Sequence, residues 1–220
     1  NATSLLVHGD TYTTANGYYF DGTGYNIRSG TNISSDVTGT NTKTLAAWYT
    51  ENVSGTNQVV AHFGDRTTGD WFAVVTGATQ VQGATYSGDV TGTGRGGAVD
   101  LGVPKLVVLT YTHSGTYPLI LYVDGQKAAT NDVGGSHVNT TAGKLTIGSS
   151  VTASADQTAH FNGVIHQVGV WDIALTPDMI KDLYNAGPTG DWSSGTAINS
   201  GTNYGSTQAA ARAIHYAMGN

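Results

Sequence analysis

The stretch that decides the fold is GVWDIALTPDMIKDLYNAG, residues 169–187, which predicts a strand running into one short helix. Thr176 is a natural N-cap, because its hydroxyl can accept an unpaired amide of the first turn. Pro177 suits the first helical position, where its missing N–H costs nothing. Gly187 supplies the left-handed residue that often follows a helix. These signals place the helix over residues 176–186.

This helix has one apolar stripe, formed at helical spacing by Ile180, Leu183 and Tyr184. A stripe of this width is typical of a helix that packs on a sheet. The helix is therefore evidence for the fold and says little about activity.

Most of the remaining chain predicts strands and tight turns. Trp48 lies near the centre of the apolar run 44–50, which we expect to be a central strand. Asp124-Gly125 separates two strand-like segments and predicts a hairpin with positive φ at both turn residues. Further strand-like segments cover residues 5–8, 18–27, 58–63, 71–76, 84–86, 105–112, 119–123, 126–130, 144–148 and 163–171.

Strict alternation along the last of these strands predicts two faces. One face carries Ile165, Gln167, Gly169 and Trp171, and the other carries Val164, His166, Val168 and Val170.

The composition limits the classes of partner. Only 11% of the 220 residues are charged, against about 25% in typical domains. The formal net charge of −6 comes without a basic run, which argues against nucleic acid as a ligand. There is no Cys, so thiolate metal sites are excluded. No apolar run approaches the roughly 18 residues of a membrane span, so we expect no membrane insertion.

The composition changes after Gly187. Residues 188–220 begin with a polar, loop-like stretch and end in the Ala-rich segment Thr207–Met218, which predicts a second helix. We divide the chain into a sandwich domain, residues 1–187, and a C-terminal extension, residues 188–220. The extension either packs on the sandwich or is an arm that docks on a neighbouring subunit.

The order of four segments resembles laminin-G-like, concanavalin A-like jelly-roll domains. Those segments are YYFDGTGY (18–25) with TKTLAAWYT (42–50), the hairpin at 105–130, KLTIGSS (144–150), and the closing strand and helix at 161–187. The resemblance covers roughly residues 17–187 and implies an all-β fold, a two-sheet antiparallel jelly-roll sandwich. The tail is also similar to the ends of such domains in phage and marine viral structural proteins, although Ala217-Met218-Gly219 lacks the Arg that recurs there.

The residue inventory argues against an enzyme. Glucanases that resemble this fold use two Glu flanking an Asp on one strand, and a retaining glycosidase needs two carboxyl groups about 5 Å apart. Glu51 is the only Glu in this chain, and no D-x-D or D-x-E occurs. We therefore predict a protein that is not an enzyme.

Two binding sites are candidates in or near the loop Gly64–Asp70. Asp70 and Trp71, with Tyr86 nearby, could form a glycan site of acidic and aromatic groups, or Trp71 could fill the core. The resemblance also implies calcium, for which Asp65 and Asp70 are the candidate ligands, joined by Asp89 or Asp124. Alternatively, Asp65 pairs with Arg66 or caps the turn.

Low charge, Gly and Thr richness and the tail predict a non-enzymatic structural or decoration protein of a virion or extracellular surface. This protein would self-associate or bind other structural subunits through residues 188–220. The alternative is a carbohydrate-binding or adhesion module that recognises surface glycans.

Overall fold

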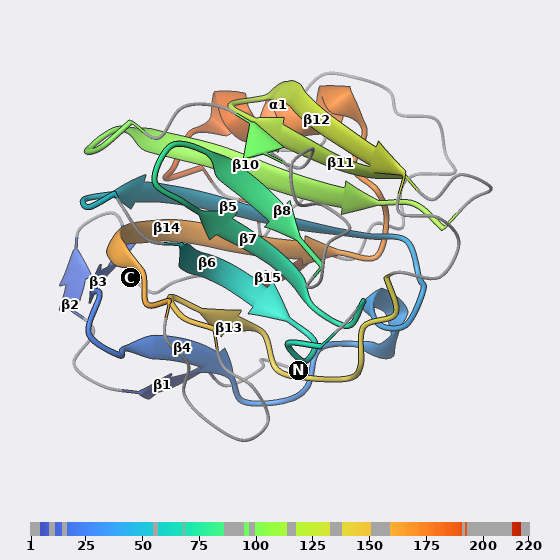
Figure 1. Ribbon diagram of the computed structural model, residues 1–220, viewed down its shortest axis with the longest axis horizontal. Coiled ribbons are helices and arrows are strands. Elements are labelled where there is room, and N and C mark those ends of the chain that lie inside the picture. The colour runs from blue at the N-terminus through green and yellow to red at the C-terminus, as the bar shows by residue number, and fades with distance from the viewer. Residues whose placement is uncertain are drawn as a thin grey trace.

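The computed structural model contains two stacked antiparallel sheets (Figure 1), which confirms the expected two-sheet sandwich. It describes residues 5–8, 12–14, 17–54, 57–67, 69–85, 95–96, 100–113, 118–132, 138–150, 159–190, 192 and 213–216.

Within the described residues, one sheet has seven strands. Their order is β1 (Leu5–His8), β4 (Asn26–Ser29), β13 (Thr146–Ile147), β6 (Gln58–Phe63), β7 (Phe72–Thr76), β8 (Val81–Ala84) and β9 (Arg95–Gly96).

The other sheet has eight strands among the residues that the structure describes. Seven follow the order β12 (Gln126–Asp132), β11 (Pro118–Val123), β10 (Pro104–Tyr111), β5 (Lys43–Glu51), β14 (Asn162–Trp171), β3 (Gly17–Asp21) and β2 (Tyr12–Thr14), and the eighth, β15 (Ala213–Tyr216), pairs with β14.

Local signals explain several of these elements. The strand predicted around Trp48 is β5, which lies at the middle of its sheet between β10 and β14. Asp124 and Gly125 have φ values of 49° and 78°, as the predicted hairpin turn between β11 and β12 requires. The segment 5–8 forms β1 at a sheet edge. A short 3₁₀ turn, η1, spans Ser35–Val37.

The main core fills the space between the sheets. It takes Phe20, Leu45, Phe72 and Leu109 from strands of both sheets, together with Phe161, which precedes β14. Each side chain is almost completely buried. Two contiguous apolar faces stacked in this way are the source of the stability of a sandwich.

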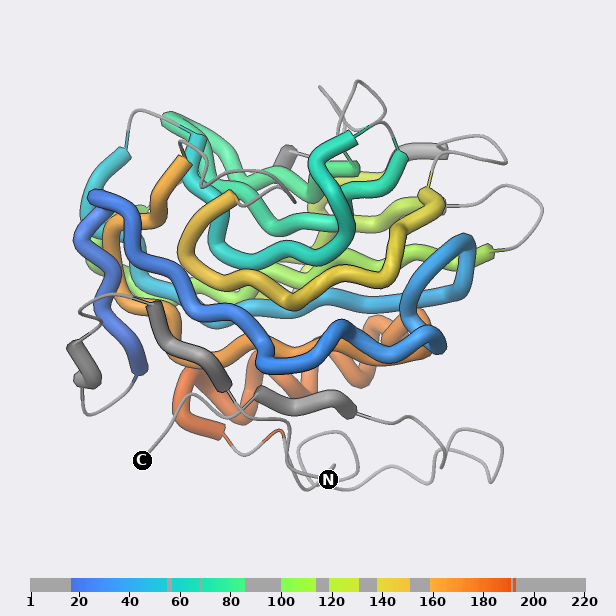
Figure 2. Tube along the Cα trace, turned by 90° about the horizontal axis from the view of Figure 1, so that it is seen from below, coloured from blue at the N-terminus to red at the C-terminus, as the bar shows by residue number. Residues whose placement is uncertain are grey.

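The single α-helix of the described residues, α1 (Pro177–Ala186), covers the outer face of the eight-stranded sheet (Figure 2). The Thr176 hydroxyl accepts a hydrogen bond from the Met179 amide at 3.3 Å, and Gly187 has φ 74°, so the predicted start and end are confirmed. Met179, Ile180 and Leu183 of the helix are buried in an apolar cluster with Trp48, Leu106, Trp171 and Trp192.

The predicted faces of the strand 163–171 are wrong at one point. Pairing of β14 with β5 skips a residue between Ile165 and Gln167, which is a β-bulge at His166. A bulge inserts one extra residue and so reverses the alternation beyond it. Ile165 therefore shares the inner core with Val168 and Val170, and not the outer face with Trp171.

The predicted helix at 207–218 is wrong for residues 213–216, which form β15 and pair with Val168–Trp171 of β14. Ala is the best helix former, but helix propensity is a weak prior that tertiary context overrides. Here pairing with free ladder positions of β14 outweighs it. Trp192 of the extension is fully buried, with its ring 5.8 Å from that of Trp171. The described parts of the extension therefore lie on the sandwich, and a docking arm stays a prediction.

Candidate functional site

Three polar side chains form a row across the outer face of the seven-stranded sheet. Thr146 of β13 lies directly opposite Arg28 of β4 and also opposite His62 of β6. Directly opposed residues of antiparallel strands point to the same face. The inward neighbours of this row, Ile27 and Phe63, belong to the core. The register of the strands therefore brings together residues that are far apart in the sequence.

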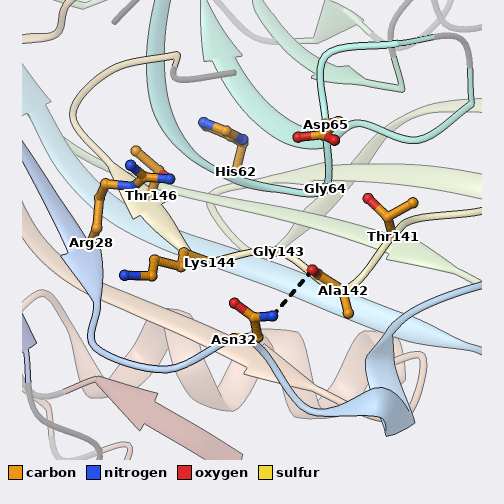
Figure 3. A pocket seen from close by; sticks show the side chains of 10 residues that line it. All are labelled: Arg28, Asn32, His62, Gly64, Asp65, Thr141, Ala142, Gly143, Lys144 and Thr146. Atoms are coloured by element: carbon orange, nitrogen blue, oxygen red, sulfur yellow. Dashed lines mark hydrogen bonds between the residues drawn. The ribbon is translucent and has the colours of Figure 1, made fainter. Parts of the chain in front are cut away.

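A pocket of about 240 Å³ lies over this row (Figure 3). The loop after β4 contributes Asn32, and the loop after β6 contributes Gly64 and Asp65. The segment before β13 supplies the rest of the lining: Thr141, Ala142, Gly143 and Lys144. The side-chain amide of Asn32 donates a hydrogen bond to the carbonyl of Ala142 at 3.4 Å and so bridges two walls of the pocket.

Asp70 holds the wall at Thr141 in place. Its carboxylate accepts hydrogen bonds from the Thr141 amide and, at 2.9 Å, from the Thr141 hydroxyl. The loop that carries Asp70 closes tightly on Gly64, whose φ of 78° suits glycine and where a Cβ would collide with the Asp70 carbonyl. Asp70 is thus a structural support of the pocket in this arrangement.

Lys43 supports the same wall from inside the sandwich. It is completely buried, and its Nζ donates to the Gly39 carbonyl at 2.7 Å and to the Thr140 hydroxyl at 2.8 Å. The ammonium also lies 5.9 Å and 5.8 Å from the ring centres of Phe72 and Tyr111. Burial lowers the pKa of Lys43 to about 7, against the opposing attraction of Asp70.

His62 forms the buried side of the pocket. Burial, and in smaller part the positive charges of Arg28 and Arg66, lower the pKa of His62 to about 3, while a hydrogen bond with the Gly64 backbone opposes this shift. The imidazole is therefore neutral at ordinary pH. Its ring centre lies 5.7 Å from that of Trp71, and the Arg66 guanidinium lies 5.7 Å over the same indole.

The charges that line the pocket are Arg28, Lys144 and Asp65. In Figure 3 the charged ends of Arg28 and Lys144 lie at one end of the pocket and the Asp65 carboxylate lies at the other. Within the described part of the chain, the ion pairs join Lys105 to Asp100 and Asp124, and none involves a residue of the pocket. The Arg28 Nε is buried without a hydrogen-bond partner among these residues.

The predicted glycan residues lie partly beside this pocket. Asp70 is 8% exposed and supports Thr141, as described above. Trp71 is 6% exposed and packs with Val59, Ala73 and Val75 on the outer face of the seven-stranded sheet. Tyr86 lies outside the described residues. Asp70, Trp71 and Tyr86 as direct ligands of a glycan stay a prediction.

The hydrogen bonds of Asp70 bear on the calcium site predicted at Asp65 and Asp70. Both carboxylate oxygens of Asp70 already accept hydrogen bonds from Thr141. In the part of the chain that the structure describes, no three His, Asp or Glu gather in a way that could hold a metal ion. Asp124 instead accepts from the Leu106 amide and pairs with Lys105, and Asp89 lies outside the described residues. Calcium binding stays a prediction, which a thermal shift between calcium and chelator would test.

Sequence reasoning missed most of the pocket. Arg28, Asn32, His62, Lys144 and Thr146 come from separate segments with no shared motif. One signal was available, because Arg28, His62 and Thr146 are polar residues in apolar strand segments. It locates a polar patch only once the pairing of β4, β13 and β6 is known.

Comparison with known proteins identifies the family. A family model described as the concanavalin A-like lectin/glucanase superfamily matches residues 20–181. The chain belongs to this superfamily. No curated protein matches the chain in sequence. The expected laminin-G-like, concanavalin A-like relationship is thereby confirmed, whereas a viral origin stays a prediction.

Solved structures of the superfamily fold resemble the chain at low identity. A Trypanosoma rangeli sialidase in complex with sialic acid matches with a TM-score of 0.61 and 16% identity, over 86% of this chain and 31% of that one. Domain 4 of an extracellular arabinanase from Geobacillus stearothermophilus, in complex with arabinotriose, matches with a TM-score of 0.54 and 16% identity, over 83% and 82%.

A heptameric pentraxin from Limulus polyphemus matches with a TM-score of 0.58 and 14% identity, over 77% of this chain and 81% of that one. The chain spans less than a third of the sialidase chains that it resembles. At these identities the likeness establishes the jelly-roll fold alone.

The superfamily includes glucanases, which use Glu side chains in catalysis, and Glu51 is the only Glu of the chain. Its carboxylate accepts hydrogen bonds from Gln58 at 2.7 Å and from Thr76 at 2.6 Å, and the residue is almost fully buried. Burial raises the pKa of Glu51. Glu51 on β5 thus connects the eight-stranded sheet to β6 and β7 of the other sheet, which is a structural use of the only Glu.

Among the described residues, no helix is long and apolar enough to cross a membrane.

Proposed function

We propose that the chain is a non-enzymatic carbohydrate-binding module that holds a sugar in the pocket over β4, β13 and β6. The observation that carries the proposal is the convergence of hydrogen-bonding side chains on one concave site: Arg28, Asn32, Asp65, Thr141, Lys144 and Thr146. Sugar recognition needs such a set of donors and acceptors, because each hydroxyl of a bound sugar must replace its hydrogen bonds to water.

The size of the pocket suits a short ligand. Its volume of about 240 Å³ lies below the roughly 300–1,000 Å³ of sites for drug-sized molecules. We therefore expect one sugar residue to enter the pocket while the rest of a glycan extends over the surface. An arabinanase domain of the same fold in complex with arabinotriose supports this proposal over that of a virion decoration protein. We infer an extracellular or cell-surface setting, where such glycans are displayed.

A glycan array with the full chain tests the function, and one variant tests its location. Ala142 is exposed at the rim, so Ala142→Trp fills the entrance without removing a charge. We expect this variant to remain folded and to lose glycan binding. Ala128→Trp, an exposed position on β12 of the other sheet, is the matched control and should bind as the unaltered protein does. A protein that binds no glycan, or an Ala142→Trp variant that binds normally, would contradict the proposal.

Self-association is a second candidate role, favoured by an apolar surface at one end of the sandwich. Val53, Leu101 and Val103 are each about half exposed, and the Gly102 amide donates to the Glu51 carbonyl, which brings the two loops together. The contribution of the extension can be tested by truncation after Trp192, since this residue belongs to the core under α1. Light scattering should then show a smaller assembly; an unchanged mass would exclude residues 193–220 as the docking segment.

A further inference from the structure

We infer that the pocket is selective for acidic sugars and binds the carboxylate of a sialic acid or uronic acid between Arg28 and Lys144. This inference rests on the proposed function and adds the class of ligand to it. It starts from the distribution of charge over the molecule. The chain has a net charge of −6 and only nine basic residues, yet two of them line one small pocket.

Among the described residues, no carboxylate forms an ion pair with either cation of the pocket. Arg28 and Lys144 are in no ion pair within the described residues, and Lys43 and Lys105 show what happens elsewhere, since both are held by hydrogen bonds or carboxylates. Arg28 is half-buried, and its Nε has no partner among the described residues. A buried guanidinium N–H without an acceptor is costly, and an anionic ligand that accepts from the Arg28 Nε would remove that cost.

The charge balance indicates a ligand with one negative charge. Arg28 and Lys144 contribute two positive charges and Asp65 one negative charge, so one positive charge remains. His62 adds none, because burial and the neighbouring Arg28 and Arg66 keep it neutral. A carboxylate matches this balance better than a doubly charged phosphate. The planar guanidinium of Arg28 can also bind both oxygens of a carboxylate at once.

The opposite end of the pocket suits the neutral part of the same sugar. In Figure 3 Asp65 and Thr141 lie away from the two cations. Asp65 can accept hydrogen bonds from sugar hydroxyls, and it would repel a carboxylate placed there. The ligand therefore enters in one orientation, with its acidic group toward Arg28 and Lys144.

Isothermal titration calorimetry with four soluble probes tests the inference. The probes are sialyllactose, a glucuronate-terminated disaccharide, sulfated lactose and neutral lactose. We expect one of the two carboxylate sugars to bind at least about tenfold more tightly than lactose, because hydrogen bonds to charged groups are among the strongest in water. The carboxylate probe that binds shows whether the ligand is a sialic acid or a uronic acid. Added salt should weaken the binding of that probe and leave the binding of lactose unchanged.

Variants that remove charges from the pocket test whether the preference for acidic sugars arises there. Arg28→Gln and Lys144→Gln should each lower the affinity for the acidic sugar about tenfold and leave the weak binding of lactose unchanged. Asp65→Asn should strengthen binding of the acidic sugar, which a loss of folding cannot mimic. Lys181→Gln, on the exposed face of α1, is the matched control and should change nothing.

Three results would each overturn the inference. They are equal affinity for lactose and the carboxylate sugars, tighter binding of sulfated lactose, and a preference for carboxylate sugars that survives in the double variant Arg28→Gln/Lys144→Gln. The proposed function fails separately, if no glycan binds or if Ala142→Trp has no effect. A pocket that Ala142→Trp blocks but that binds neutral sugars regardless of Arg28 would refute the selectivity alone.

Discussion

The outer face of the eight-stranded sheet is covered by α1, and Trp48 and Trp171 of the sheet are buried there against Leu183 of the helix. The outer face of the seven-stranded sheet instead carries Arg28 and His62, which line an open pocket. The covered face is apolar and uses its side chains for stability. The open face contains cations that no protein group neutralises among the described residues. The covered face contributes to folding, and we propose that the open face binds a ligand, so variants on each face should separate the two roles.

The largest change in stability should come from removing a buried side chain under α1. Trp171 is fully buried between Trp192 and the helix, so Trp171→Ala should lower the free energy of unfolding by about 3–5 kcal/mol. Guanidinium unfolding measures this loss, and Trp171→Phe should cost less because it leaves a smaller cavity. The Trp171→Ala protein that remains folded should bind glycans as the unaltered protein does. If the variant is fully folded but no longer binds glycans, the two faces do not have separate roles.

The second effect concerns Lys43, which supports the pocket wall from the core. Burial lowers the pKa of Lys43 to about 7, whereas an exposed lysine titrates near 10.5. Between these values the unfolded chain holds more protons, so the free energy of unfolding should rise with pH. At about 1.36 kcal/mol per pKa unit, the rise from pH 7 to 9.5 is on the order of 3 kcal/mol.

Lys43→Met, which keeps the length of the side chain without its charge, should remove this rise. Urea unfolding at a series of pH values provides the measurement, and the range ends below pH 10 because burial also raises the pKa of Tyr49. If the two proteins show parallel pH profiles, Lys43 does not carry the effect.

Much of the fold could be predicted from the sequence because its signals are local. The turn Asp124-Gly125, the cap Thr176 and the stop Gly187 each depend on a few adjacent residues. The errors arose where distant pairing decides the outcome. The bulge at His166 exists only relative to β5, and residues 213–216 become a strand only because β14 is beside them.

The site was less predictable for the same reason. The sequence predicts a site in or near the loop from Asp65 to Trp71, and this loop does lie next to the pocket. The charged groups that define the chemistry, Arg28 and Lys144, are 116 residues apart in the chain and belong to no motif. Only the pairing of β4 with β13 brings their segments together.

A third, smaller effect should come from His62 at the buried side of the pocket. Its pKa is lowered to about 3, whereas an exposed histidine titrates near 6.5. Between these values the unfolded chain binds more protons, so the free energy of unfolding should fall as the pH falls from 6.5. The loss to pH 4.5 is on the order of 2–3 kcal/mol.

His62→Gln should flatten this acid dependence in thermal unfolding. Glu51, with its raised pKa, contributes a slope of opposite sign, but it does so in both proteins and cancels in the comparison. An acid profile as steep as that of the unaltered protein would show that the proton uptake on unfolding comes from other groups.

The smallest effect should come from Tyr184, where the covered face reaches solvent. The sequence predicts Ile180, Leu183 and Tyr184 as equal members of one stripe, but Tyr184 is 41% exposed while the other two are buried. Its ring stacks on Trp48 at 5.7 Å between centres and 15° between planes. Tyr184→Ala should therefore cost only about 0.5–1.5 kcal/mol of unfolding free energy.

Tyr184→Phe keeps the stacked ring and should retain the stability of the unaltered protein in the same denaturant titration. Equal losses in Tyr184→Ala and Tyr184→Phe would show that the hydroxyl, and not the stacking on Trp48, holds this edge of the helix. Glycan binding should be unchanged in both variants, because α1 packs on the eight-stranded sheet (Figure 2), whereas the pocket lies over β4, β13 and β6 of the other sheet. A helix variant that altered binding would mean that the eight-stranded sheet transmits changes to the pocket face.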